Sequence, residues 1–380
     1  MMEKLGNFIS EYSVRNKQDE DIPVYSVTNE HGFCTGYFSK DVSSKDRTTY
    51  KIVPYGCFAY NPSRINVGSV DWQHVEDRVI VSPLYVVFRV NEELDQRYLL
   101  HYLKSDMTLA LIKAKASGSV RDNLKLSDLQ EFPIVVHNIE KQRRVADNID
   151  KVDQLISLYQ QRLVVLDELV KSRFIELFGD PKYNALEWPV YLLGNLFTVG
   201  SSKRIYQSDQ VQEGIPFLRI SDLMNRIENK DETAELFITA ELYEELRENN
   251  LVPVVGDILV TSRGTLGQCY EIREQDKFYF QDGMISWLYN RNEKITNTYL
   301  MYLFRMPGFR LQIDEVPAGS TVNYLSLVRM KNLKIMCPPL ELQEQFAAFV
   351  EEVDKSKFVV QQSLRELETL KKSLMQKYFG

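Results

Sequence analysis

The chain has 380 residues, a formal net charge of −7 and 44% apolar residues. This length predicts two or three domains, and ordinary glycine and proline contents exclude collagen-like and low-complexity chains. No apolar run reaches the ~18 residues of a membrane span, and no signal-peptide core follows Met1. Four cysteines without CxxC spacing and four histidines argue against a zinc site. We therefore expect a soluble, cytoplasmic protein, and its acidic charge argues against nucleic-acid binding unless local features outweigh it.

Residues 1–138 alternate short β-branched and aromatic runs with turn signals, which predicts strands at 22–27 and 79–90. Residues 95–115 are more helical. Two polar loops combine glycine with side chains that suit base edges or phosphates, although each loop taken singly could equally be an ordinary polar turn. The candidate DNA-binding residues of this module are Tyr60, Asn61, Arg64, Asn66, Ser119, Arg121 and Asn123.

Residues 139–179 carry apolar side chains in a 4-3-4-3 alternation, which is typical of a coiled-coil helix. Gly179 is expected to cap this helix, and Pro181 prevents its continuation. A helix of ~38 residues would be a rod of roughly 55–60 Å. The alternative is an ordinary amphipathic core helix. The positions expected to contact a second helix are Val152, Ile156, Tyr159, Leu163 and Leu166.

Residues 180–338 again alternate strand-like runs with turns, and predict strands at 215–220, 256–262 and 283–289. Residues 298–313 are more helical. Polar loops occur at the ends of these strands and before the next long helix, as in the first module. The candidate DNA-binding residues here are Lys203, Arg204, Arg219, Ser262, Arg263, Ser320, Thr321 and Asn323.

Residues 339–380 predict a second long helix with the same heptad register. Lys357 and Lys371 interrupt its apolar positions, and Gly380 is expected in the cap position. The positions expected to contact the first helix are Val360, Leu364 and Leu367.

An internal repeat connects the two halves. Residues 118–179 align without a gap onto 319–380, and 19 of the 62 positions are identical, where average composition would give roughly four. Upstream the similarity is weaker and its offset drifts, from 188 at Leu5-Gly6-Asn7 towards 201. Insertions normally fall in loops, so the modules are expected to vary in their loops while the helical tails keep a fixed geometry.

No catalytic constellation is recognisable in the sequence. The chain lacks a phosphate loop and a G-x-G-x-x-G in a strand–helix context. Cys337-Pro338-Pro339-Leu340 is the nearest approach to the tetrapeptide of an adenine methyltransferase, and it lacks both the polar and the aromatic end. The four histidines have no serine or cysteine partner at triad-like spacing. These absences predict a protein that binds rather than catalyses.

The whole pattern resembles the specificity (S) subunits of Type I restriction-modification systems. The most specific match is the entrance Pro338-Pro339-Leu340-Glu341-Leu342-Gln343 into an apolar heptad helix, and the run 256–264 resembles the middle of their recognition domains. The first half departs from the entrance motif, with His137-Asn138-Ile139-Glu140-Lys141-Gln142.

The resemblance implies an α+β fold with a pseudo-two-fold internal repeat. Target-recognition domains at 1–138 and 180–338 would be separated by conserved helices at 139–179 and 339–380, packed as an antiparallel coiled coil. Each domain would bind one half of a bipartite site in double-stranded DNA. Two modification (M) subunits carrying S-adenosylmethionine and two motor-nuclease (R) subunits using ATP and Mg²⁺ would be the partners, and this chain would hold no cofactor or metal.

Two other classes stay open at this point. An S-like recognition subunit of a single-polypeptide or Type IIB-like system would bind DNA in the same way with different partners. A coiled-coil scaffolding protein would explain the helices, but not two divergent modules whose polar loops correspond.

Overall fold

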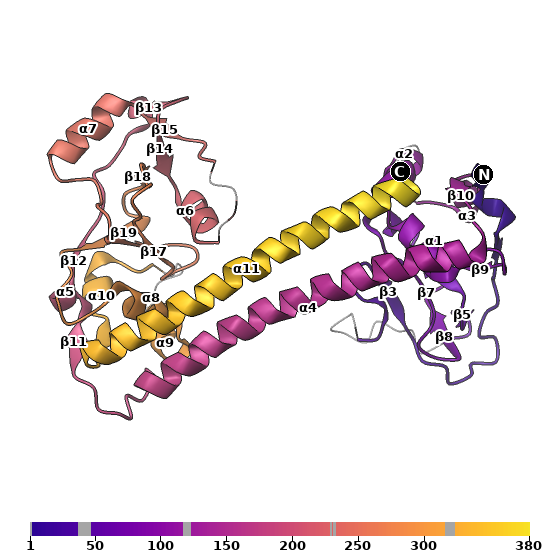
Figure 1. The fold of residues 1–380 in the computed structure, drawn as a ribbon, viewed down its shortest axis with the longest axis horizontal. Helices are drawn as coiled ribbons and strands as arrows, with labels where there is room; N and C mark the ends of the chain where they lie inside the picture. Colours follow the sequence, from indigo (N-terminus) through magenta and orange to yellow (C-terminus); the bar gives the residue numbers. More distant parts are fainter. Residues whose placement is uncertain (1, 37–46, 117–122, 229, 231–232, 316–323) are drawn as a thin grey trace. The chain divides into compact units, whose positions relative to one another are not determined.

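The computed structural model describes residues 2–36, 47–116, 123–228, 230, 233–315 and 324–380. The chain divides into two compact units: unit 1 contains residues 1–162 and 360–380, and unit 2 contains residues 163–359. Two 40-residue helices, α4 (Ile139–Phe178) and α11 (Leu340–Phe379), each contribute to both units (Figure 1). The predicted domain limits stay predictions, because the compact units divide within these helices.

Unit 1 is built on an antiparallel sheet with the strand order β2-β9-β6-β7. One face shares a buried cluster with the two-stranded sheets β3-β4 and β5-β8, and the other shares a cluster with α1 and α2. A further pair, β1-β10, precedes α4. The elements are β1 (Met2–Lys4), β2 (Ile9–Glu11), β3 (Ser26–Thr28), β4 (Gly32–Cys34), β5 (Lys51–Pro54), β6 (Phe58–Tyr60), β7 (Val70–Trp72), β8 (Arg78–Val81), β9 (Val86–Val90), α1 (Gln96–Leu103), α2 (Asp106–Ala116), α3 (Leu126–Gln130) and β10 (Pro133–Val135).

Unit 2 repeats this plan with the antiparallel sheet β12-β19-β16-β17 and the pair β11-β20. It adds a second four-stranded sheet, β13-β15-β14-β18, in which β14 and β18 are parallel. The elements are β11 (Val190–Leu192), α5 (Leu193–Leu196), β12 (Thr198–Gly200), β13 (Gln210–Val211), β14 (Ile215–Leu218), α6 (Ile220–Ile227), β15 (Phe237–Ile238), α7 (Ala240–Glu248), β16 (Ile258–Thr261), β17 (Cys269–Glu271), β18 (Tyr279–Phe280), β19 (Ile285–Tyr289), α8 (Asn297–Arg305), α9 (Pro307–Asp314), α10 (Leu327–Lys331) and β20 (Lys334–Met336).

The predicted mixture of strands and helices in each module is confirmed, but three predicted elements are split. The run 79–90 is two strands, β8 and β9, separated by a turn. The run 95–115 is two helices, because the hydroxyl of Ser105 accepts from the backbone N of Thr108 and caps α2. The run 298–313 breaks before Pro307, which begins α9.

The end of α4 follows from glycine chemistry. Gly179 has φ +75°, in the left-handed region that favours glycine, and its N donates to Ile175 O at 2.8 Å. The predicted cap at this position is therefore confirmed.

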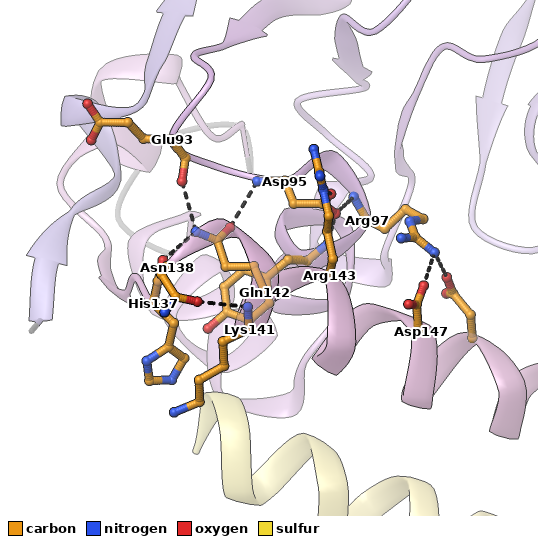
Figure 2. A network of polar contacts seen from close by, with 11 residues as sticks. Glu93, Asp95, Arg97, His137, Asn138, Lys141, Gln142, Arg143 and Asp147 are labelled. Carbon is orange, nitrogen blue, oxygen red and sulfur yellow. Dashed lines mark hydrogen bonds and ion pairs between the residues drawn. The ribbon is translucent and has the colours of Figure 1, made fainter.

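A buried glutamine ties the start of α4 to unit 1. Gln142 is fully buried, and its Oε1 accepts from Asp95 N at 2.9 Å. Its Nε2 donates to Glu93 O at 2.8 Å and to His137 O at 2.7 Å, as Figure 2 shows. One side chain thus supplies hydrogen-bond partners to three backbone groups from two separate segments of unit 1.

Unit 2 contains the same arrangement at the start of α11. Gln343 is also fully buried, and its Oε1 accepts from Thr296 N at 2.8 Å. Its Nε2 donates to Lys294 O at 2.9 Å and to Pro338 O at 2.8 Å. The glutamine and its three partners are all related to their counterparts in unit 1 by 201, the offset of the sequence repeat.

Each long helix has its N-terminal end in one unit and its C-terminal end in the core of the other unit. In unit 1 the ring of Phe379, from α11, lies 5.0 Å from Tyr98 and 6.2 Å from Tyr102. In unit 2 the ring of Phe178, from α4, lies 4.8 Å from Tyr299. Both phenylalanines are buried. Each long helix therefore begins in one unit and completes the core of the other.

Candidate nucleic-acid interface

The turn after β6 in unit 1 projects an arginine. The Oδ1 of Asn61 accepts from the backbone N and the hydroxyl of Ser63, at 3.1 and 2.9 Å, which closes an Asx turn. Arg64 follows in an exposed position. The turn ends at Gly68, with φ +85°, where a Cβ would come within 2.5 Å of Asn29 Oδ1. The local geometry thus holds Arg64 at the surface.

The residues after the polar loop at 118–123 join this turn. The backbone N of Leu124 donates to Pro62 O at 3.2 Å, and the hydroxyl of Tyr60 donates to Leu124 O at 3.2 Å. Asn123 is exposed beside them. Although the two predicted loops are far apart in sequence, the described end of the second therefore lies against the first.

Unit 2 has the equivalent junction after β16. The backbone N of Leu325 donates to Ser262 O at 3.0 Å. The guanidinium of Arg263 lies over the Tyr324 ring, 4.8 Å from its centroid, a cation–π contact that restrains an exposed side chain. Gly264 follows with φ +65°. Both units thus join a strand-end turn to the residues that follow the second polar loop.

Asn66 is half-buried in the 3₁₀ helix Ile65–Val67. Five other candidate residues lie outside the described residues. The five are Ser119, Arg121, Ser320, Thr321 and Asn323.

Two candidates are buried, which corrects the expectation that they contact DNA directly. Tyr60 has no exposed surface, because the strand alternation turns its ring into the core. Burial raises the pKa of its hydroxyl above the ordinary range. Ser262 is 1% exposed, and its hydroxyl pairs with that of Ser286 at 2.7 Å. Both residues hold the turns in place rather than present a side chain to a ligand.

Two candidate arginines of unit 2 are already engaged by carboxylates. The Nε of Arg204 lies 3.0 Å from Asp282 Oδ2. Arg219 contacts Asp222 at 3.2 Å and Glu235 at 2.9 Å, and the hydrogen bond with Asp222 raises the pKa of its guanidinium. A DNA phosphate would compete with these carboxylates. Lys203 is freer, since its nearest carboxylate oxygen, on Glu245, is 3.9 Å away.

Sequence reasoning missed a basic pair in unit 1, Arg15 and Lys51, which the fold places opposite each other. A signal for it was present. The offset of 188 that relates Leu5-Gly6-Asn7 to its repeat also relates Arg15 to the candidate Lys203.

The heptad positions of the long helices are shielded from solvent to different degrees. All eight candidate contact positions are buried or half-buried. The two interrupting lysines each form an ion pair with an aspartate of the other long helix: Lys357 with Asp167 at 2.6 Å in unit 2, and Lys371 with Asp153 at 2.6 Å in unit 1. A residue early in α4 thus meets one late in α11, and a residue late in α4 meets one midway along α11.

Among the residues that the structure describes, no group of three or more histidine, cysteine, aspartate or glutamate side chains is placed to hold a metal ion. Nor does any described helix combine the length and apolar composition that crossing a membrane requires.

Two α/β modules with corresponding sheets, corresponding buried glutamines and polar turns at corresponding strand ends define an internally duplicated protein. A family model described as the Type I restriction modification DNA specificity domain matches residues 2–168 and 186–369. The chain belongs to this family, that of Type I restriction-modification specificity subunits with DNA-recognition domains.

Curated relatives include a putative type I restriction enzyme specificity subunit, S.HindORF215P, from Haemophilus influenzae. It is 26% identical over 268 residues, which cover 69% of this chain and 65% of that protein, just under two thirds of its length. The MjaVIII specificity subunit of Methanocaldococcus jannaschii is 20% identical over 312 residues, covering 78% of this chain and 72% of its own.

Solved structures share the fold along the chain. One comes from work on complex assembly and conformational transition in the type I R-M system, with TM-score 0.57 and 18% identity over all of this chain and 97% of the other. Another is a Type-I restriction-modification S subunit from M. genitalium, with TM-score 0.54 and 18% identity over all of this chain and 96% of the other.

Proposed function

We propose that this chain binds a bipartite, asymmetric DNA site, with unit 1 and unit 2 each reading one half. The observation that carries the proposal is the repetition of buried contacts at the fixed offset of 201, seen at Gln142 and Gln343. Two equivalent modules in one chain supply two equivalent surfaces. Because their exposed turns carry different side chains, the two surfaces would select different bases.

Within each module, we assign DNA contact to the turn after β6 or β16 and to the polar sequence at 118–123 or 319–323. Arg64 and Arg263 are exposed in these turns, and a guanidinium can donate two hydrogen bonds to guanine or to a phosphate. Asn61, Asn66 and Asn123 would supplement them in unit 1, and Lys203 in unit 2. The loop residues Ser119, Arg121, Ser320, Thr321 and Asn323 complete the assignment.

We assign α4 and α11 to an antiparallel coiled coil, related by a pseudo-two-fold axis, whose length sets the gap between the half-sites. The ion pairs Lys357–Asp167 and Lys371–Asp153 support this pairing. Charged residues at heptad positions cost stability but fix the register of two helices. A fixed register is what a spacer of constant length requires.

The partners in this proposal follow from membership of the family. Two methyltransferase (M) subunits, carrying S-adenosylmethionine, would bind the duplicated chain, and two motor-nuclease (R) subunits would add ATP- and Mg²⁺-dependent cleavage. This chain would supply recognition without a catalytic centre of its own, and the complex would work in the cytoplasm.

An insertion into α4 tests the spacer. Four residues added near Asp167 would lengthen the helix by about 6 Å, and at about 3.4 Å per base pair the gap should grow by one or two base pairs. The bases of both half-sites should stay the same, because the modules are untouched. The measurement is sequencing of methylated adenines in cells that express the variant with its modification subunits.

A matched control adds the same four residues in the exposed turn after Glu274, outside both helices, and should leave the gap unchanged. An unchanged gap with a changed half-site sequence in the α4 variant would show that the helices are not the spacer.

A further inference from the structure

Two basic residues of unit 1 lie directly opposite each other. Arg15 and Lys51 form an antiparallel bridge. The hydrogen bonds that flank it run from Ile52 N to Val14 O and from the residue after Arg15 to Tyr50 O, both at 2.9 Å. This pattern makes the two a non-hydrogen-bonded pair, in which the side chains share a face and approach most closely. Like charges in such a pair are destabilising.

These two charges have no direct ionic partner among the described residues, although the Glu11 carboxylate attracts Lys51. The Lys51 ammonium donates to Tyr85 O at 2.6 Å, which uses one of its three hydrogens. Burial lowers the pKa of Lys51, the charge of Glu11 raises it, and the charge of Arg15 lowers it again. Arg15 itself is exposed.

The pair lies at the same end of the sheet as the recognition turn. Strands β2 and β6 both run antiparallel to β9, which lies between them, and so they end on the same side. Arg15 comes four residues after the last residue of β2, and Arg64 comes four residues after the last residue of β6. With strands about 4.8 Å apart, the two chain segments leave the sheet about 10 Å from each other.

Unit 2 has a basic residue in the corresponding place. Its strands β12 and β16 both run antiparallel to β19, and Lys203 follows β12 as Arg15 follows β2. In both units, therefore, a basic residue follows the first strand of the sheet (β2 or β12), and an exposed arginine follows the third strand in sheet order (β6 or β16).

We propose that Arg15 and Lys51 bind a DNA phosphate and so position unit 1 for the contacts made by the turn after β6. The inference rests on the proposed DNA-binding function and adds a backbone contact to it. A phosphate between the two side chains would replace their repulsion by two charge-assisted interactions. Phosphate contacts fix register and orientation but carry no sequence information.

The test measures binding of the full-length chain to 40-bp duplexes of several unrelated sequences over a range of salt concentrations. Arg15→Gln should weaken binding about threefold to tenfold and reduce the slope of log K against log salt by about 0.9, the value for one lost phosphate contact. Arg15→Lys should keep the slope, because lysine retains the charge. Arg144→Gln is the matched control, since it removes an exposed arginine of unit 1 from α4.

Stability separates this role from a structural one. Without DNA, Arg15→Gln should leave the thermal midpoint unchanged or higher, because it relieves the repulsion with Lys51. An Arg15→Gln slope equal to that of the wild type and Arg144→Gln would overturn the proposal, as would a loss confined to particular sequences. No duplex binding by the wild-type chain would instead contradict the proposed function itself, and the phosphate contact with it.

Discussion

Units 1 and 2 correspond closely in their buried polar contacts and less closely in their exposed turns. The glutamines Gln142 and Gln343 bind the same three backbone positions in each unit, and all six hydrogen bonds measure between 2.7 and 2.9 Å. The turns after β6 and β16 occupy the same place, but one closes on an asparagine and the other holds Arg263 over Tyr324. The comparison teaches that the frame is constrained by buried hydrogen bonds, while the surface is free to change.

Near the glutamines, the contact between the long helix and the preceding short helix differs between the two units. In unit 1 Asp150 binds His101 at 2.7 Å and Arg97 at 3.0 Å, so that α1 and α4 meet through charges. In unit 2 the residue that corresponds to His101 is Tyr302, and its ring packs on Phe346 at 5.3 Å. Four predictions test how far this division between frame and variation extends.

The largest effect is expected at the far ends of the long helices. Phe178→Ala should lower the free energy of unfolding by about 3–5 kcal/mol, the cost of removing a buried aromatic side chain. Phe379→Ala should cost less, because Phe379 contacts two rings and Phe178 contacts three. Urea denaturation followed by circular dichroism measures both. Phe358→Ala, at a 62% exposed position of α11, is the control. If Phe178→Ala and Phe379→Ala cost no more stability than Phe358→Ala, the helix ends would not complete the cores as described.

Substitution of either buried glutamine should cost about 3 kcal/mol. Gln142→Leu or Gln343→Leu would remove three hydrogen bonds to backbone groups, although Lys294 O would keep its contact with Cys337 Sγ. A polar group that loses its partner away from water costs roughly 1–3 kcal/mol. The two losses should be similar, as the contacts are. Gln160→Leu, on an exposed face of α4, should change the same unfolding measurement little. A large difference between the two glutamine variants would show that the frames are not equivalent.

Arg263→Ala should weaken binding of the cognate duplex by about 1–3 kcal/mol if the guanidinium contacts a base, and should relax specificity in one half-site only. Binding competition between duplexes mutated in one half-site or the other measures this. Arg291→Ala is a suitable comparison, because Arg291 Nη1 hydrogen-bonds Ile295 O within unit 2 instead of projecting from the recognition turn. Relaxed specificity in both half-sites would contradict the division of labour between the units.

The smallest effect is the acid-dependent loss of stability expected from Asp150 of unit 1. Partial burial raises the pKa of Asp150, but the hydrogen bond and charge of His101 and the charge of Arg97 outweigh it, so the pKa lies below its ordinary value of 3.8. A carboxylate with a lowered pKa contributes stability above its unfolded-state pKa and loses it as the pH falls through the folded-state pKa. Stability should therefore decline below about pH 4.

Asp150→Asn should remove this acid-dependent part, which unfolding midpoints measured between pH 6 and pH 2.5 would show. Glu351→Gln makes the corresponding change in the second copy of the repeat, where the carboxylate is exposed and pairs with Lys355 of its own helix. If both variants lost the same acid dependence, the charge network would not distinguish the units.

The parts of the fold that could be predicted from the sequence are those in which buried apolar side chains recur at regular intervals. The heptads and the gap-free repeat indicated α4 and α11, because apolar side chains recur wherever one face of a helix is covered. The same periodicity could not show what covers it: nothing near Phe379 in sequence identifies Tyr98 and Tyr102 as its partners. The split at Ser105 was missed because a hydroxyl cap is hard to distinguish from a polar residue within a helix.

The candidate site was less predictable for a related reason. Tyr60 stands next to Asn61, so composition alone marked it as part of a polar turn, whereas the strand alternation buries it. The carboxylate of Asp222, three residues after Arg219, could have been anticipated as its partner. Asp282 lies 78 residues after Arg204, and only the fold brings them together.

The packing of the C-terminal end of α11 in unit 1 also affects how the chain folds during synthesis. Tyr98 and Tyr102 of unit 1 are translated long before Phe379, because most of the chain lies between them in sequence. A ribosome adds about 5–20 residues per second, so this aromatic surface stays open for more than about ten seconds. Contacts of such long sequence separation are slow to form and leave apolar surface exposed to aggregation. Unit 1 can therefore complete this part of its core only after the last turns of α11 have been translated.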